Sequence, residues 1–388
     1  MSKKSNNCCK KTSIGGQALM EGIMMRGPVT TAMAVRNTSG EIVVEKFPTE
    51  AKKRASILKW PIIRGVVAYI DSMTLGTKCL MRSAEISGLE EAEEELRREK
   101  EAKKAAKAAK KAEKIAEKQG NNGQNISSVT KQVDVAGAAA EEPIAESDVI
   151  EEKSNSKDNK KKEGSTTLGV MMPIVTILSL GIAILLFFVL PSYLFEWAQV
   201  PFAFLKNDNE IIQSLIKSVF EGSFKVIILV GYMACMLLMK DIRRTFRFHG
   251  AEHKTIFCYE AGLELTVENV KKQRRFHPRC GTSFLILMVL VSIFVSFCID
   301  PIFLLASGSV PATAIRAIIR VALIPIIVGL GYELIKIAGK HDNFITKIIS
   351  APGVWLQHIT VLEPSDDMIE CAIVAMKEVI PEDESDKL

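Results

Sequence analysis

Side chains that bind metals or transfer protons are concentrated in one stretch of the sequence, residues 249–280. It contains His249, Glu252, His253, His277 and Cys280. His249 and His253 are four residues apart, a spacing that places two side chains on one face of a helix, one turn apart. The pattern His-x-x-Glu-His is the inverted zincin arrangement, in which the glutamate is the general base for a zinc-bound water. The stretch therefore predicts a zinc site with Glu252 as its base.

The end of this stretch, 274–281, supplies the last two ligand candidates. His277 and Cys280 stand close together with Gly281 after them, which resembles half of a zinc knuckle, where a tight turn directs two ligands at one ion. If all four candidates bind, they close a tetrahedron and the site is structural, whereas three ligands and a water leave the site open for catalysis. Carboxylates nearby are alternative ligands: Glu260, Glu264 and Glu268.

The same residues also have an interpretation without metal chemistry. His249 and His253 could line a basic helix at the membrane surface, with Glu252 in a salt bridge to Arg247 or Lys254 on a solvated face. Three of the five histidines of the chain nevertheless fall within 29 residues. This clustering favours the metal site.

Two further segments contain candidate site residues. The glycine-rich segment Gly15–Pro28 has only two charged residues, Glu21 and Arg26, and lacks the spacing of a phosphate-binding loop. A buried Glu21–Arg26 ion pair is one interpretation of this segment, and a contribution of Glu21 to the site is the other. Glu333 lies near the edge of an apolar segment, where an ionisable residue is a functional candidate unless Lys336 pairs with it.

Composition excludes several classes of protein. The net charge of +5 among 388 residues is too small to indicate a nucleic-acid-binding protein. The eight cysteines form no repeated framework and are expected to be reduced thiols. No apolar core follows the N-terminal residues, so we expect no cleavable signal peptide.

Long apolar segments predict a multi-pass membrane protein with about four spans, since roughly 20 apolar residues cross a bilayer. The predicted spans are Leu168–Leu190, Val226–Met239 extended by Phe224 and Lys225, Thr282–Ile299 and Ala312–Ile337. The last one contains Pro325 and several charges, and a re-entrant segment is its alternative.

The distribution of basic residues predicts the orientation in the cell membrane. Residues 240–281 contain ten Lys and Arg, 191–223 contain two and 300–310 contain none. An excess of Lys and Arg marks the cytoplasmic side, which places 240–281 and both termini in the cytoplasm. Arg316 and Arg320, toward the outside, argue against this scheme. The basic residues of 240–281 would also attract anionic lipid head groups.

The predicted fold class is mainly α, a polytopic helical membrane protein with a small N-terminal α+β region. Residues 1–84 contain strand candidates at 32–36 and 42–47 and a helix at 62–81, lying on the membrane surface or packed on its own domain. Residues 85–167 form a charged, low-complexity and largely disordered insert. The spans occupy 168–340. The tail, 341–388, contains an interfacial turn at 351–356 and an amphipathic helix.

Several of these segments together resemble the YqhQ-like family of bacterial membrane proteins, a domain family of unknown function. The matching segments are Gly15–Pro28, His249–His253, His277–Gly281, Gly331–Lys336 and Ala351–Leu356. Members of the family are described as predicted metal-dependent enzymes. The resemblance implies metal-ligand roles for the two histidines of the first motif and for His277 and Cys280, with Glu252 as base.

The leading functional hypothesis is a cytoplasmic-facing zinc hydrolase that acts on a membrane-associated substrate. A membrane scaffold or adaptor with a structural zinc site is the alternative, and a transporter is the second alternative. The lipid bilayer is the expected partner, and the sequence does not indicate which protein, if any, is a partner.

Overall fold

The computed structural model describes residues 11–49, 55–88, 98, 174–341, 343–383 and 385–387. The chain divides into two compact units, one made of Met1–Glu90 with Ala183–Leu388 and the other of Glu91–Ile182. The second unit contributes residue 98 and the helical residues 174–182 to the description, while the sheet and the candidate site belong to the first unit. Most of the insert predicted at 85–167 lies outside the described residues.

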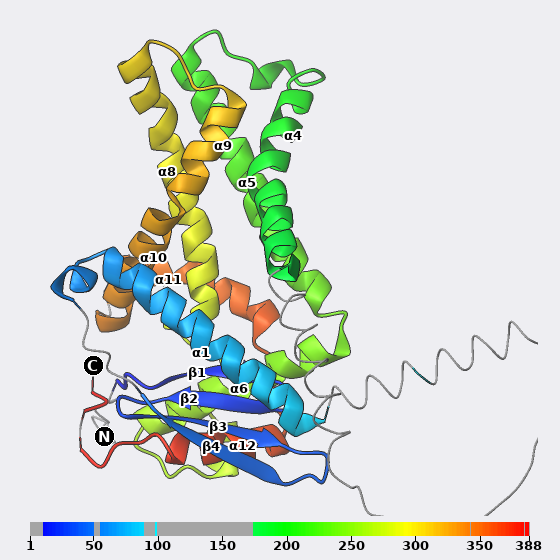
Figure 1. The fold of residues 1–388 in the computed structure, drawn as a ribbon, viewed down its shortest axis with the longest axis vertical. Helices are drawn as coiled ribbons and strands as arrows, with labels where there is room; N and C mark the ends of the chain where they lie inside the picture. Colours follow the sequence, from blue (N-terminus) through cyan, green and yellow to red (C-terminus); the bar gives the residue numbers. More distant parts are fainter. Residues whose placement is uncertain are drawn as a thin grey trace, which may run out of the picture. The chain divides into compact units, whose positions relative to one another are not determined.

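Four antiparallel strands near the N-terminus form a sheet in the order β1-β2-β3-β4 (Figure 1). They are β1 (Gly15–Leu19), β2 (Gly22–Arg26), β3 (Thr30–Arg36) and β4 (Ile42–Pro48). The last two agree with the strands predicted at 32–36 and 42–47. The first two lie in the glycine-rich segment, where the sequence lacks the alternation of apolar and polar residues that marks a half-exposed strand.

Both faces of the sheet are covered, which explains this missing alternation. Helices α6 (Lys240–Glu260) and α12 (Asp366–Lys377) pack on one face, and α1 (Ile63–Ser87) packs on the other (Figure 1). Successive residues of β2 point to opposite faces. Met25 packs in one core with Phe248 and Met368, whereas Met24 packs with Cys79 of α1 in a second core. The short helix α7 (Val267–Lys271) adds Val270 to the first core.

Helix α1 contacts the protein along one side and exposes apolar residues on another. Gly65 approaches Gly329 so closely that an added Cβ would lie 3.1 Å from its Cα. Arg64 donates to both carboxylate oxygens of Glu333, at 2.6 and 2.5 Å. Ile70 and Met73 remain 56% and 51% exposed. The helix therefore packs on its own chain, and its exposed apolar residues are compatible with a membrane surface.

Three helices are long and apolar enough to cross a membrane: Ile174–Ala198, α5 (Glu210–Met236) and α8 (Gly281–Ser307). The chain is thus mainly helical with a small N-terminal sheet, as predicted. Helices α9 (Thr313–Ala322) and α10 (Ile324–Lys340) meet at a bend of 50° and together form a broken span or a re-entrant loop. Both alternatives predicted for this fourth segment therefore remain.

The boundaries of two spans differ from the predicted ones. The first does not end at Pro191 but continues through α4 (Leu190–Ala198), and a π-helical turn at Leu185–Val189 precedes the proline. We attribute this continuation to the wider turn, which gives the proline ring room against the preceding carbonyls. Helix α5 begins at Glu210 rather than near Val226, because the charged residues before that valine are buried against other helices instead of ending the apolar segment.

The interfacial turn predicted at 351–356 is wrong. These residues lie inside α11 (Phe344–Thr360), which begins with a capping box made by Asn343 and Thr346. Pro352 is tolerated inside the helix, and Gly353 packs directly on Ser283 of α8, where an added Cβ would lie 2.4 Å from the serine Cβ. Trp355 is 58% exposed on this helix.

Candidate metal centre

The site is built where α6 meets the residue that precedes α8. His249 and His253 project from one face of α6, and the centres of their rings are 4.4 Å apart. Cys280 is the N-cap residue of α8, and its sulfur accepts the backbone N–H of Thr282. One donor atom from each of these three residues lies within 4.8 Å of the others. The structure thus brings together three of the four predicted ligands in a group able to bind a metal ion.

Backbone carbonyls fix the orientation of both imidazole rings. The Nδ1 atom of His249 lies 3.0 Å from the Thr360 oxygen, and that of His253 lies 2.6 Å from the Arg275 oxygen. A carbonyl only accepts hydrogen bonds, so both Nδ1 atoms donate and carry a proton. Metal-binding histidines characteristically donate their second ring nitrogen in this way, which leaves the first for the ion. Both Nε2 atoms are accordingly assigned as ligand atoms.

The surroundings of these Nε2 atoms fit a metal site. The Nε2 of His249 lies 3.1 Å from the sulfur of Cys280. The Nε2 of His253 is buried, and the described residues offer it no hydrogen-bond partner. A buried ring nitrogen without a partner costs free energy unless a ligand satisfies it. The donor set, two imidazoles and one thiol, is one that zinc accepts.

The electrostatics of the site favour the thiolate form of Cys280. Burial alone would raise the pKa of this thiol, but His249 and His253 beside it hold the pKa well below its usual range. Burial likewise disfavours a charged His249, yet the thiolate outweighs it and raises the pKa of His249 to about 9. The thiolate is the form of cysteine that binds metals, and an ion would displace the proton shared between His249 and the sulfur.

Glu252 lies beside this group but is not part of it. Glu252 is 5% exposed and packs against Gly16 of β1, whose backbone N–H favours the ionised carboxylate. Within the described part of the chain its second oxygen, Oε2, has no partner. Burial raises the pKa of this carboxyl, and the imidazoles of His249 and His253 counteract that rise. A carboxyl so perturbed beside ligand atoms suits a general base.

The solvated salt bridge considered for Glu252 is wrong. Lys254 instead pairs with Glu363 and donates to the Lys271 oxygen, and Arg247 donates to the Glu363 oxygen. The bonds of these two cations join α6 to the segment between α11 and α12. Glu252 itself points into the protein, toward β1.

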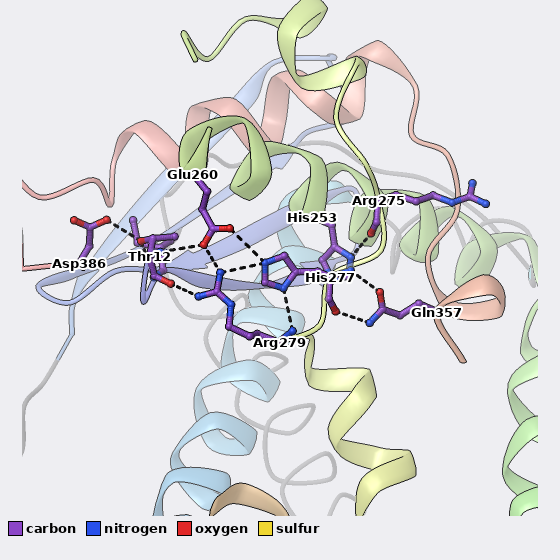
Figure 2. Close-up of polar contacts among 9 residues, drawn as sticks. Thr12, His253, Glu260, Arg275, His277, Arg279, Gln357 and Asp386 are labelled. Atoms are coloured by element: carbon purple, nitrogen blue, oxygen red, sulfur yellow. Dashed lines mark hydrogen bonds and ion pairs between the residues drawn. The ribbon is translucent and has the colours of Figure 1, made fainter. Parts of the chain in front are cut away.

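His277 lies next to His253 (Figure 2) but does not belong to the metal-binding group. Its Nδ1 accepts the backbone N–H of Arg279, at 3.2 Å. Burial, and then the charges of His253 and Arg279, lower the pKa of His277 well below its usual value, so the ring is neutral. Its Nε2 lies 3.4 Å from a guanidinium nitrogen of Arg279 and 4.0 Å from Oε2 of Glu260. In this arrangement neither ring nitrogen is free to bind the ion.

His277 instead helps to hold the turn before α8. Gln357 of α11 accepts its backbone N–H at 2.8 Å and donates to its carbonyl oxygen at 2.7 Å. Arg279 bonds to Glu260 and to the Thr12 oxygen, which joins the turn to the C-terminal end of α6 (Figure 2). These contacts fix Cys280 at the end of the turn.

The remaining predicted site residues have structural partners elsewhere. Glu21 pairs with Arg244 of α6, so the expected Glu21–Arg26 pair is wrong; the two residues lie at opposite ends of β2. Glu333 pairs with Arg64 of α1 rather than with Lys336. The alternative carboxylates Glu260, Glu264 and Glu268 are also outside the metal-binding group, as far as the described residues extend.

Several residues that shape the site carry no signal of their own in the sequence. Thr360 and Arg275 orient the histidines through backbone oxygens, which every residue has. Gln357 bonds to the backbone of His277, which is 80 positions away in the sequence. Gly16 is different, because the glycine-rich segment indicates close approach of its backbone. An added Cβ at Gly16 would lie 2.9 Å from Cγ and Cδ of Glu252.

Comparison with known proteins identifies the family. The family described as "Protein of unknown function (DUF1385)" matches residues 60–382, which include all the ligand candidates. The chain belongs to this family. It is also 30% identical over 370 residues to "Uncharacterized protein YqhQ" of Bacillus subtilis (strain 168), covering 94% of this chain and 92% of that protein. The predicted resemblance is confirmed. No solved structure matches the chain.

Proposed function

We propose that this protein is a membrane hydrolase with a catalytic zinc ion bound by His249, His253 and Cys280. The observation that carries the proposal is the fixed orientation of two imidazoles, whose second nitrogens bond to carbonyls while the ligand nitrogens face the thiolate. Three protein ligands are typical of catalytic zinc, which keeps its fourth position for water or substrate, whereas structural sites bind zinc with four.

Glu252 is the base in this proposal. Zinc bound by these residues would supply a Lewis acid and lower the pKa of a coordinated water to about 7. The free Oε2 of Glu252 would take the proton of the attacking water, and Gly16 packs directly against the glutamate side chain. The neighbouring strand β1 thus positions the base, and burial excludes bulk water from its carboxyl.

A membrane-associated substrate fits the place of the site in the chain. Cys280 directly precedes α8, one of the helices apolar enough to span the membrane. We place the site on the cytoplasmic side, because of the ten Lys and Arg within 240–281. The two arginines that argued against this orientation are each paired with a buried carboxylate, Arg316 with Asp300 and Arg320 with Glu221. Both arginines are therefore buried between helices rather than exposed in a loop that flanks a span.

Oxygen-18 incorporation tests the hydrolase directly. Hydrolysis places one water oxygen in a product, so the purified protein is incubated with a bacterial membrane extract in H₂¹⁸O. Mass spectrometry of the extract then reports labelled products. The wild-type protein loaded with zinc should produce label, and Glu252→Gln should bind as much zinc and produce none, because the amide cannot take the proton.

Glu268→Gln is the matched control, since Glu268 is an exposed carboxylate outside the group. It should label products like the wild type. If zinc binds and no product is labelled by any of the three proteins, the hydrolase proposal fails and the scaffold with a structural zinc takes its place. Equal labelling by Glu252→Gln and the wild type would remove Glu252 as the base.

A further inference from the structure

A line of buried ionisable side chains runs through the helices apolar enough to span the membrane. Its members are each at most 9% exposed: Lys217, Glu221, Lys225, Asp300, Arg316 and Arg320. The first three follow one another at intervals of four on α5, and the two arginines are four apart on α9, so each set lies along one helix face. Ionisable residues inside a membrane are costly and mark functional sites by default.

One part of this line is electrically balanced. Arg316 reaches Asp300 of α8 through Nε at 2.9 Å and through a second nitrogen at 2.8 Å. Ser214 of α5 also donates to the Asp300 carboxylate. Lys217 lies 3.4 Å from Glu196, which is half-exposed at the edge of the line. Every cation in this part has an acidic partner.

The next part of the line contains two cations, Arg320 and Lys225, and one carboxylate, Glu221. Glu221 accepts from Ser192 at 2.7 Å and pairs with Arg320 at 2.5 Å. Lys225, one turn further along α5, is 3% exposed, and no carboxylate or hydrogen-bond acceptor contacts its ammonium among the described residues. The ammonium lies 5.2 Å from the centre of the Phe188 ring. A cation–π contact is attractive, but it leaves the positive charge uncompensated.

Two donors in this part are buried without a hydrogen-bond partner among the described residues. Neither Nε of Arg320 nor the hydroxyl of Ser218 has a hydrogen-bond partner within the described ranges. Ser218 precedes Lys225 by two turns on α5, on the face that also carries Glu221. Buried donors and buried cations are normally satisfied by an acceptor or a counter-charge. Glu221, whose Oε2 also lacks a hydrogen-bond partner among the described residues, is one carboxylate beside two cations, so an anion with several acceptor oxygens would balance the charge and supply the missing acceptors.

A cavity lies against the balanced part of the line, one helical turn before Ser218 and Arg320. It has a volume of about 410 Å³ and lies among α4, α5 and α9, with Ser214, Lys217 and Arg316 in its wall. Ser218 and Arg320 follow these lining residues by one helical turn on the same two helices. A ligand in the cavity would thus approach the unpartnered donors from the balanced part of the line.

We propose that Lys225, Arg320 and Ser218 form an anion-binding site within the membrane helices, which takes a phosphate-type oxyanion through this cavity. The oxyanion belongs to a phospholipid head group or to free phosphate, since both present the same acceptor oxygens. The site is separate from the zinc proposal and rests on none of its residues.

Thermal unfolding of the delipidated full-length protein in neutral detergent tests the site. One series adds sodium phosphate against sodium chloride at equal ionic strength, and the other adds phosphatidylglycerol against phosphatidylcholine. Phosphate or phosphatidylglycerol should raise the melting temperature of the wild type by several degrees, because a ligand that binds only the folded state stabilises it. A response to phosphate assigns the free anion, and a response to phosphatidylglycerol alone assigns the lipid.

Three variants connect this response to the site. Lys225→Met should abolish it, and because the change removes an unpaired buried charge, the variant should still fold. Lys225→Arg keeps the cation and should retain the response. Lys206→Met removes an exposed lysine of the loop before α5 and should behave like the wild type. The proposal is overturned if the wild type responds to neither anion, or if Lys225→Met responds as fully as the wild type.

Discussion

At the scale of single residues, the site depends on which nitrogen of each histidine faces the metal position. His249 and His253 use Nδ1 to hold carbonyls and present Nε2, whereas His277 accepts a backbone N–H at Nδ1 and faces Glu260 with Nε2. The three rings are close neighbours, since those of His253 and His277 are 5.6 Å apart. Proximity alone therefore does not make a ligand, and the second bond of each ring decides its role.

Zinc content of purified variants tests this distinction. His253→Gln should reduce zinc affinity by more than the roughly 10–100-fold typical of losing an outer partner, because a direct ligand is removed. His277→Gln should keep zinc near the wild-type stoichiometry, and so should the control His358→Gln, whose side chain is exposed. Elemental analysis by mass spectrometry measures bound zinc per chain. Equal loss of zinc from the first two variants would contradict a site of three ligands and favour four.

At the scale of elements, β1 and α6 form one unit around Glu252. The strand contacts the helix along its length, and Gly16 lies directly against the glutamate side chain. Glycine at this position lets the backbone approach the carboxylate side chain closely. The base of the proposed reaction is thus positioned by a strand more than 230 residues away in the sequence.

Substitution of the two adjacent glycines tests this contact. Gly16→Ala would place a Cβ 2.7 Å from the Met24 oxygen and 2.9 Å from the Glu252 side chain. We expect a loss of about 1–3 kcal/mol in unfolding free energy, as for other overpacked positions, together with reduced product labelling. Gly15→Ala is the control, since its Cβ would meet nothing within 4 Å. Chemical denaturation of both variants measures the difference, and equal stabilities would contradict close packing of β1 on Glu252.

At the scale of the whole molecule, buried ion pairs connect helices of the apolar part of the chain. Asp300 of α8 binds Arg316 of α9 and Ser214 of α5, so one carboxylate joins three helices. Glu221 of α5 similarly joins Arg320 of α9 to Ser192 of α4. These pairs explain why charged residues occur inside segments that would otherwise be apolar.

Removing one partner of such a pair should be costly. Asp300→Asn leaves Arg316 buried without a counter-charge and should lower the unfolding free energy by about 3–5 kcal/mol. Asp208→Asn, at an exposed position before α5, should have no measurable effect. Unfolding in detergent, followed by helical circular dichroism, compares the two. A change of stability as small as that of the control would show that Arg316 does not depend on Asp300.

The sequence by itself determined what depends on local pattern. Apolar length located the spans, and the spacing of four placed His249 and His253 on one helix face, since helix geometry acts over a few residues. The position of Cys280 beside them was also predicted, because two adjacent spans bring the ends of their loop together. Local pattern misled where tertiary burial intervened, as in β2, which is covered on both faces, and in α5, whose charged residues Lys217, Glu221 and Lys225 are buried.

Only the tertiary structure decided the roles of residues whose partners are distant. The oxygen that orients His249 lies 111 positions away, and Arg244 is 223 positions from Glu21. Contacts between residues so far apart in the sequence produce no local spacing pattern from which they could be predicted. His277 illustrates the limit: its sequence context matches a ligand, yet its Nδ1 accepts the backbone N–H of Arg279 and its Nε2 faces Glu260, and the residue lies outside the metal-binding group. Hydrogen bonding across the fold, rather than residue type, separates the ligand histidines from their neighbour.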